Sequence, residues 1–233
     1  MIKQNKELVT ENLKNEVSKE VAALFSIKDN MEGVVARLPQ IKIIHAGQLF
    51  ELPDGEKTEK IKGIILDTNR VNAFWGKTFA ETGGGSAPDC WSMNGVSPAK
   101  ECGSNSNIKY CHECDNNLFE EDGHGKKCKN MKRVHILIGN EQLPYRLTLP
   151  PSNLKAIDKY LTGVAAKGIP YQCVVTEFSL KKAVSSGFEY SEIACKILEV
   201  ISDVEFAKKI AKMLTEIKPI MREQQIVASE YEG

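Results

Sequence analysis

Residues 60–75 read KIKGIILDTNRVNAFW and predict a long β-strand. The β-branched and aromatic side chains of residues 63–66 and 71–75 suit a pleated sheet surface. Residues 38–52, which begin LPQIKI, predict another strand, and the PDGE of residues 53–56 is a turn sequence. We therefore expect two successive strands, joined by a tight turn, in this part of the chain.

The chain beyond residue 130 alternates between strand and helix patterns. Four segments predict strands, at residues 134–138, 145–149, 171–183 and 190–201. A helix pattern opens at the PPS of residues 150–152 and is stopped by the KGIP of residues 167–170. The last two strands are separated by the SSG of residues 185–187, which predicts a hairpin.

Two amphipathic helices are expected at the ends of the chain. Residues 6–28 and residues 203–221 carry apolar side chains at helical spacing on a charged background. The tail over residues 222–233 is expected to be frayed.

The order of these elements predicts a mostly β fold with flanking helices. A small Greek-key barrel of the OB type has its helix between the third and fourth strands, which agrees with this order, although a generic α+β sheet would also fit. We predict an N-terminal helix over residues 1–30, an OB-like barrel over 31–202, and a C-terminal helix and tail over 203–233. A loop inserted at about residues 81–130, between the second and third strands, interrupts the barrel.

Composition limits the classes of partner. The 233 residues carry 31 basic and 31 acidic side chains, so any site for a polyanion must be a local patch. Residues 126–133, KKCKNMKR, supply five cations within eight positions. No apolar run approaches the ~20 residues of a membrane span, and the N-terminus has no apolar signal core. We therefore expect a cytoplasmic protein without a membrane partner.

Five of the seven cysteines lie between residues 90 and 128, in a stretch rich in small polar residues. Four thiolates around one Zn²⁺ would order such a stretch, and the two-residue gap in Cys111-x-x-Cys114 allows both sulfurs to face one ion. Cys128 is the expected third ligand of this structural zinc site. Spacing alone leaves the fourth open among Cys90, Cys102, His112 and His124.

Other interpretations of the cysteines are weaker. A reducing cytoplasm disfavours a disulfide framework, and Cys111-x-x-Cys114 lies in a polar loop rather than after a strand of a βαβ unit, which disfavours a redox pair. A catalytic deaminase zinc would need a His-x-Glu and a separate Pro-Cys-x-x-Cys. Cys173 and Cys195 are expected to be small buried side chains.

Six short stretches together resemble the zinc-containing single-stranded-DNA-binding proteins, of the OB fold, that phages and integrated mobile elements encode. They are LPQIKI (38–43), VNAFW (71–75), PDCWS (88–92), CHEC (111–114), GKKCKN (125–130) and LTLPPS (147–152). The resemblance implies that Cys90 is the fourth zinc ligand and that the residues around Cys102 are an addition. It also implies sequence-independent binding of single-stranded DNA, in replication or recombination.

Single-strand binding needs cations that follow the backbone and flat rings on which bases stack. The candidate cations are Arg70, Lys77, Lys126, Lys127, Lys129, Lys132 and Arg133. The candidate rings are Trp75, Trp91 and Tyr110. Phe74, Phe79 and Phe119 are further candidate rings. Each ring has a structural alternative: Phe74 and Trp75 point to opposite faces of a strand, so one belongs to the core, and the alternative for Phe119 is packing of the zinc turn.

The sequence contains no catalytic signature. The GGGS of residues 83–86 is not followed by the Lys-Ser/Thr of a phosphate loop, and no Gly-x-Ser-x-Gly or His-Glu-x-x-His occurs. We therefore expect a non-catalytic protein. The alternative to a strand binder is a zinc-ribbon module that docks onto a replication or transcription assembly, with the terminal helices or tail as contacts for replication or recombination proteins. The choice between DNA and RNA stays open.

Overall fold

The computed structural model of the chain describes residues 37–44, 47–77, 81, 87–100, 102, 108–121, 125–139, 141–185 and 188–226. The predicted helix over residues 6–28 lies outside these ranges. Leu38–Gly233 form one unit by their internal contacts, so the C-terminal helix belongs with the sheet.

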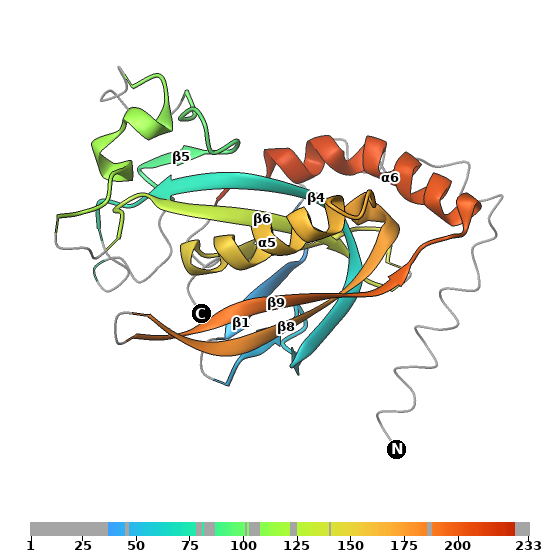
Figure 1. The fold of residues 1–233 in the computed structure, drawn as a ribbon. Helices are drawn as coiled ribbons and strands as arrows, with labels where there is room; N and C mark the ends of the chain where they lie inside the picture. The colour runs from blue at the N-terminus through green and yellow to red at the C-terminus, as the bar shows by residue number, and fades with distance from the viewer. Residues whose placement is uncertain are drawn as a thin grey trace. The chain divides into compact units, whose positions relative to one another are not determined.

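The described chain is mostly β, with a nine-stranded sheet that curls into a half-barrel and two helices (Figure 1). The strands are β1 Gln40–Ile44, β2 Leu49–Glu51, β3 Lys57–Thr58, β4 Lys60–Phe74, β5 Cys90–Ser92, β6 Lys129–Leu137, β7 Tyr145–Leu149, β8 Val174–Ser185 and β9 Phe188–Val200. The helices are α5, Leu154–Ala165, and α6, Val204–Glu223. Strand order is β3-β2-β1-β7-β6-β4-β8-β9, with β5 paired to β4. The β1–β7 pair is parallel and the other pairs are antiparallel.

Strand β4 is the centre of this arrangement, because it pairs with β6, β8 and β5. Both of its faces are covered, which explains why its residues are buried almost without interruption from Gly63 to Ala73. Ile61 and Ile65 join the core cluster that includes Ile157 of α5, whereas Ile64 and Leu66 join a second cluster with α6.

Helix α5 is tied to the sheet at its first turn. The side chain of Asn153, just before the helix, donates from Nδ2 to Ser191 O at 3.0 Å and accepts from the backbone N–H of Ile193. Ile157 is fully buried one turn later. These contacts fix α5 over β9 and the interior of the curled sheet.

Helix α6 covers the other face of the sheet. Asp203 caps its N-terminus by accepting from the backbone N–H groups of Glu205 and Phe206. Ile210, Ile217 and Met221 form its buried stripe.

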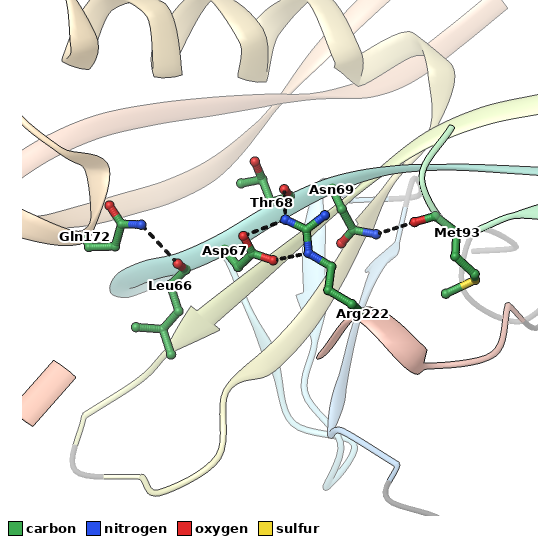
Figure 2. Close-up of polar contacts among 7 residues, drawn as sticks. All are labelled: Leu66, Asp67, Thr68, Asn69, Met93, Gln172 and Arg222. Atoms are coloured by element: carbon green, nitrogen blue, oxygen red, sulfur yellow. Dashed lines mark hydrogen bonds and ion pairs between the residues drawn. The ribbon is translucent and has the colours of Figure 1, made fainter. Parts of the chain in front are cut away.

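The chain remains ordered after α6, and the expectation of a frayed tail from residue 222 is wrong for residues 222–226. Arg222 binds the Asp67 carboxylate (Figure 2). Arg133 donates to the carbonyls of Gln224 and Gln225, and Ile226 is buried. The backbone N–H of Leu38 also donates to Gln224 Oε1 at 3.1 Å.

Most predicted elements are confirmed: the turn at residues 53–56, the long strand, the strand at 145–149, α5, the hairpin of β8 and β9, and α6. The single strand predicted over residues 38–52 is wrong, because the chain reverses around Gly47 and Gln48, which have φ of 96° and 54°, and forms β1 and β2. Strand β6 begins at Lys129, five residues before the predicted 134. Among the described residues, neither helix has the length and apolar character needed to cross a membrane.

Candidate functional site

The cysteine-rich segment lies between β4 and β6 and begins with the short strand β5. Cys90 pairs with Phe74 across β5 and β4, and Ala73 pairs with Lys129 across β4 and β6. Extending the second register by one residue puts Cys128 on the opposite side of Phe74. The sheet itself thus brings the backbones of residues 90 and 128, which are far apart in sequence, to either side of Phe74 in β4.

The Cys111-x-x-Cys114 segment is held in a tight turn by backbone hydrogen bonds. Two 3-10 turns, Cys111–Glu113 and Asp115–Asn117, follow each other directly. Asn117 is buried and donates from Nδ2 to Cys111 O at 2.8 Å. The N–H of Cys128 donates to Asn116 O at 2.7 Å, which joins the third predicted ligand to this turn.

The segment is also joined to the sheet. Asn69 and Asn72 of β4 donate from Nδ2 to the carbonyls of Met93 and Gly95, each at 3.2 Å; Figure 2 shows the first of these bonds. The N–H of Cys111 donates to Val96 O at 2.7 Å. The loop after β5 therefore connects the cysteine turn to the middle of β4.

One cavity of 340 Å³ lies at the centre of this segment, and five cysteines line it: Cys90, Cys102, Cys111, Cys114 and Cys128. The seven cysteines of the chain, all within the described ranges, are free thiols. All four predicted zinc ligands therefore face one space, together with Cys102.

The thiols lie close enough to influence one another. Burial, a hydrogen bond with Cys102 and the proximity of Cys102, Cys128 and Cys111 raise the pKa of Cys90 to about 12. Burial and the proximity of Cys111 and Cys114 raise the pKa of Cys128 to about 12, against the opposing effect of Lys126 and Lys129.

The donor set fits zinc in its chemistry. Thiolate sulfur is a preferred ligand of Zn²⁺, and structural sites commonly use four of them. The described residues nevertheless contain no group of three or more His, Cys, Asp or Glu side chains arranged to hold a metal ion. The cysteines share a cavity without forming a ligand shell.

Cys102 has a defined place that sequence reasoning did not anticipate. Its Sγ accepts from the backbone N–H of Trp91 at 2.9 Å and lies 3.2 Å from Trp91 O. It is buried and lines the same cavity as Cys90. The arrangement therefore does not distinguish Cys90 from Cys102 as a fourth ligand.

Three predicted cations lie beside the cysteine turn and define what we call the basic rim: Lys126, Lys127 and Lys129. Lys126 Nζ lies 4.9 Å from the centre of the Phe119 ring, and Lys127 Nζ lies 3.8 Å from Glu120 Oε1. The side chain of Lys129 is exposed, and its Nζ donates to Lys126 O at 3.4 Å. All three cations are held by local contacts; Lys127 and Lys129 are exposed, and Lys126 is half-buried.

The aromatic residues divide into exposed and packed ones. Phe119 is 76% exposed, so of its two interpretations the structure disfavours packing in the turn. Tyr110 stacks on His112 at 5.5 Å between ring centres, with Lys109 Nζ 5.3 Å from the Tyr110 ring. Trp75 and Trp91 pack partly buried against an apolar cluster on β4 and β6, although Trp91 also lines the cysteine cavity.

The remaining predicted cations lie apart from the basic rim. Lys77 is exposed after the end of β4. Arg70 and Lys132 both contact Asp158 of α5, a residue that sequence reasoning missed. Arg133 is fully buried and donates to Gln224 O in the C-terminal segment. Its side chain is therefore not exposed for the DNA contact that the sequence predicted.

Comparison with known proteins finds no matching family model, no matching curated protein and no matching solved structure.

Proposed function

We propose that the protein binds single-stranded DNA without sequence preference and without catalysis, through a loop ordered by structural zinc. The observation that carries this proposal is the meeting of five cysteines around one cavity, beside the basic rim and the exposed Phe119. Cations and an exposed ring on one ordered loop are the two components that single-strand binding requires.

The strand order supports an OB-type barrel. Taking β4 as the first strand, the path β7-β6-β4-β8-β9 has α5 between its third and fourth strands in sequence. The cysteine segment then connects the first and second barrel strands, one connection earlier than the sequence suggested. In OB folds this loop, with the loop between the last two strands, contacts oligonucleotides.

Zinc would be held by Cys111, Cys114 and Cys128, with Cys90 as the fourth ligand that the family resemblance implies. When bound, the ion would cross-link β5, the cysteine turn and the start of β6. The protein's own contribution is to bring these three segments together by the β4 register and by the Asn117 and Asn116 hydrogen bonds. A loop fixed in this way keeps its lysines in place with little loss of entropy on binding.

The test is fluorescence anisotropy of a labelled oligo-dT of about 20 nucleotides, long enough for one to several OB-type sites. It is measured with the full-length protein at two or more salt concentrations, with a duplex competitor. We expect binding that weakens with salt at a log–log slope of about −0.7 for each phosphate contacted. Binding that is absent at micromolar protein, or equally strong to duplex, would contradict the proposal.

A docking module is the second candidate, and a specific surface favours it. Where β9 leads into α6, the exposed apolar side chains are Leu198, Val200, Val204 and Phe206, with exposed fractions of 38%, 48%, 64% and 38%. Exposed apolar groups of this kind mark protein contacts when they are contiguous. Failure to bind DNA would favour this candidate.

A further inference from the structure

Two cations face each other on the surface of β4 and β6 next to the cysteine segment. Arg70 and Lys132 are directly opposite in the antiparallel register, so their side chains leave the same face of the sheet. Two like charges in this relation repel each other unless an anion lies between them. The sheet therefore builds a position that attracts a negative group.

Asp158 of α5 supplies that negative group. Its Oδ2 accepts from Arg70 Nη2 at 3.0 Å, and its Oδ1 contacts Lys132 Nζ. One carboxylate oxygen therefore contacts the cation of β4, and the other contacts the cation of β6. The net charge of the three side chains is +1.

The cluster is open to solvent on the Arg70 side. The side chains of Arg70, Asp158 and Lys132 are 61%, 37% and 10% exposed. An exposed ion pair such as Arg70–Asp158 contributes little to stability, so exchanging Asp158 for another anion at Arg70 requires little free energy.

The cluster continues into the cysteine segment. The next residue pair on the same face is Asn72 and Asn130, joined by a 3.0 Å hydrogen bond, and Asn72 lines the cysteine cavity. A Cβ on Gly95 would lie 2.8 Å from Arg70 Cβ, so only glycine lets this loop pack against the base of Arg70. Asn72, which lines the cavity, therefore lies only about 7 Å along the strand from Arg70.

We infer that Arg70 and Lys132 form a phosphate-binding position in which Asp158 is an internal competitor that a phosphate group of the bound strand displaces from Arg70. This inference rests on the proposed function and names a second contact for the same strand, beyond the basic rim. A phosphate carries the charge and the paired acceptor oxygens of a carboxylate, so it satisfies the same two donors. Asp158 thus limits the affinity of the protein for single strands.

The experiment compares wild-type protein with Asp158→Asn, using oligo-dT anisotropy across a salt series. Asp203→Asn is the matched control, because it removes the same charge from the N-cap of α6 and asparagine caps a helix equally well. We expect Asp158→Asn to bind about fivefold more tightly at 0.1 M salt with an unchanged slope, because the same phosphates are contacted in both complexes, and Asp203→Asn to match wild type.

The outcomes separate this inference from the proposed function. Wild-type binding tests the function, whereas the difference between the two variants tests Asp158. If wild type binds and the two variants behave alike, Asp158 is no competitor and the inference is overturned. If wild type fails to bind but Asp158→Asn binds, the phosphate position is supported and the proposed function fails. If neither binds, both fail.

A second variant covers the case in which Asp158→Asn does not fold. Arg70→Gln changes an exposed side chain, and we expect it to weaken oligo-dT binding about fivefold and to flatten the salt slope by about 0.7. Unchanged affinity and slope in a folded Arg70→Gln protein would overturn the inference by itself.

Discussion

Arg222 in the last turn of α6 binds Asp67 of β4 through two parallel hydrogen bonds, Nε to Oδ2 at 2.5 Å and Nη2 to Oδ1 at 2.8 Å (Figure 2). Nη2 also donates to Thr68 O at 3.1 Å. The Asp67 side chain is 5% exposed and the Arg222 side chain 39%. The bulge between Ile65 and Asp67 in the β4–β6 register lies directly before this contact.

Replacing Arg222 by alanine should therefore leave a buried carboxylate without its guanidinium partner. We expect a loss of about 2–3 kcal/mol in the free energy of unfolding, somewhat less than for a fully buried pair because Arg222 is partly exposed. Urea denaturation measures it. Lys208→Ala, which breaks the exposed pair with Glu205 in the same helix, should change stability by less than about 0.5 kcal/mol. Equal effects of the two substitutions would contradict this account.

His135 makes the protein sensitive to acid. It is fully buried, neither ring nitrogen has a hydrogen-bond partner among the described residues, and it faces Asp67 as well as Arg133, Arg146 and Arg222. Burial, opposed by Asp67 and assisted by the three arginines, lowers its pKa from 6.5 to about 4. Between these values the unfolded chain binds more protons than the folded protein, so stability falls as pH falls from about 6.5 towards 4.

We expect His135→Gln to remove this part of the acid sensitivity, which is on the order of 3 kcal/mol across the whole window. Urea denaturation of both proteins at pH 7.5, 6 and 5 measures this effect. The difference in the free energy of unfolding between wild type and His135→Gln should shrink or reverse as the pH falls. Between pH 7.5 and 8.5 the two stabilities should change in parallel. Curves that stay parallel down to pH 5 would exclude His135 as the cause.

Zinc content tests the cysteine site directly. Protein purified without added metal should contain one zinc per chain by elemental analysis, and Cys128→Ser should lose it together with several kcal/mol of stability. Cys195→Ser removes a thiol from the core of the sheet, so its zinc content should stay that of wild type. Comparing Cys90→Ser with Cys102→Ser identifies the fourth ligand. Full zinc content in Cys128→Ser would mean that this assignment is wrong.

Reversing charge on the basic rim should weaken DNA binding without unfolding the protein. Lys127→Glu with Lys129→Glu alters two exposed side chains, and we expect at least tenfold weaker oligo-dT binding with a salt slope flatter by about 1.4. The control is Lys209→Glu with Lys212→Glu, which makes the same charge change on the exposed face of α6. An equal loss in both double variants would indicate a general charge effect rather than a site at the rim.

The long strand and the final hairpin could be predicted because both are long and β-rich. Strands β1 and β2 were merged because each is short and the turn at Gly47 and Gln48 has no proline or repeated glycine to mark it. The start of β6 was missed for another reason. Its first residues are mainly cations, and they form a strand because Met131 and Arg133 find partners under the C-terminal segment.

Sequence reasoning found the cysteines by composition and spacing, and the structure gathers them in one cavity. It could not rank the cations, because burial depends on partners far along the chain: Arg133 meets Gln224, 91 positions away, and Lys132 meets Asp158. The sequence does not indicate which residues a carboxylate on the polar side of an amphipathic helix will contact. Asp158 therefore became visible only with the fold.

The hydrogen bond from Leu38 to Gln224 joins positions that are 186 residues apart. The two ends of the described part of this unit therefore lie next to each other. Circular permutation exploits such proximity. Joining residue 38 to residue 226 by a short flexible linker and opening the chain between β8 and β9 should give a protein of the same fold. The permutant would lack the residues before 38 and after 226. Comparing its binding with that of the wild-type protein would therefore separate what the sheet binds from what the terminal residues contact.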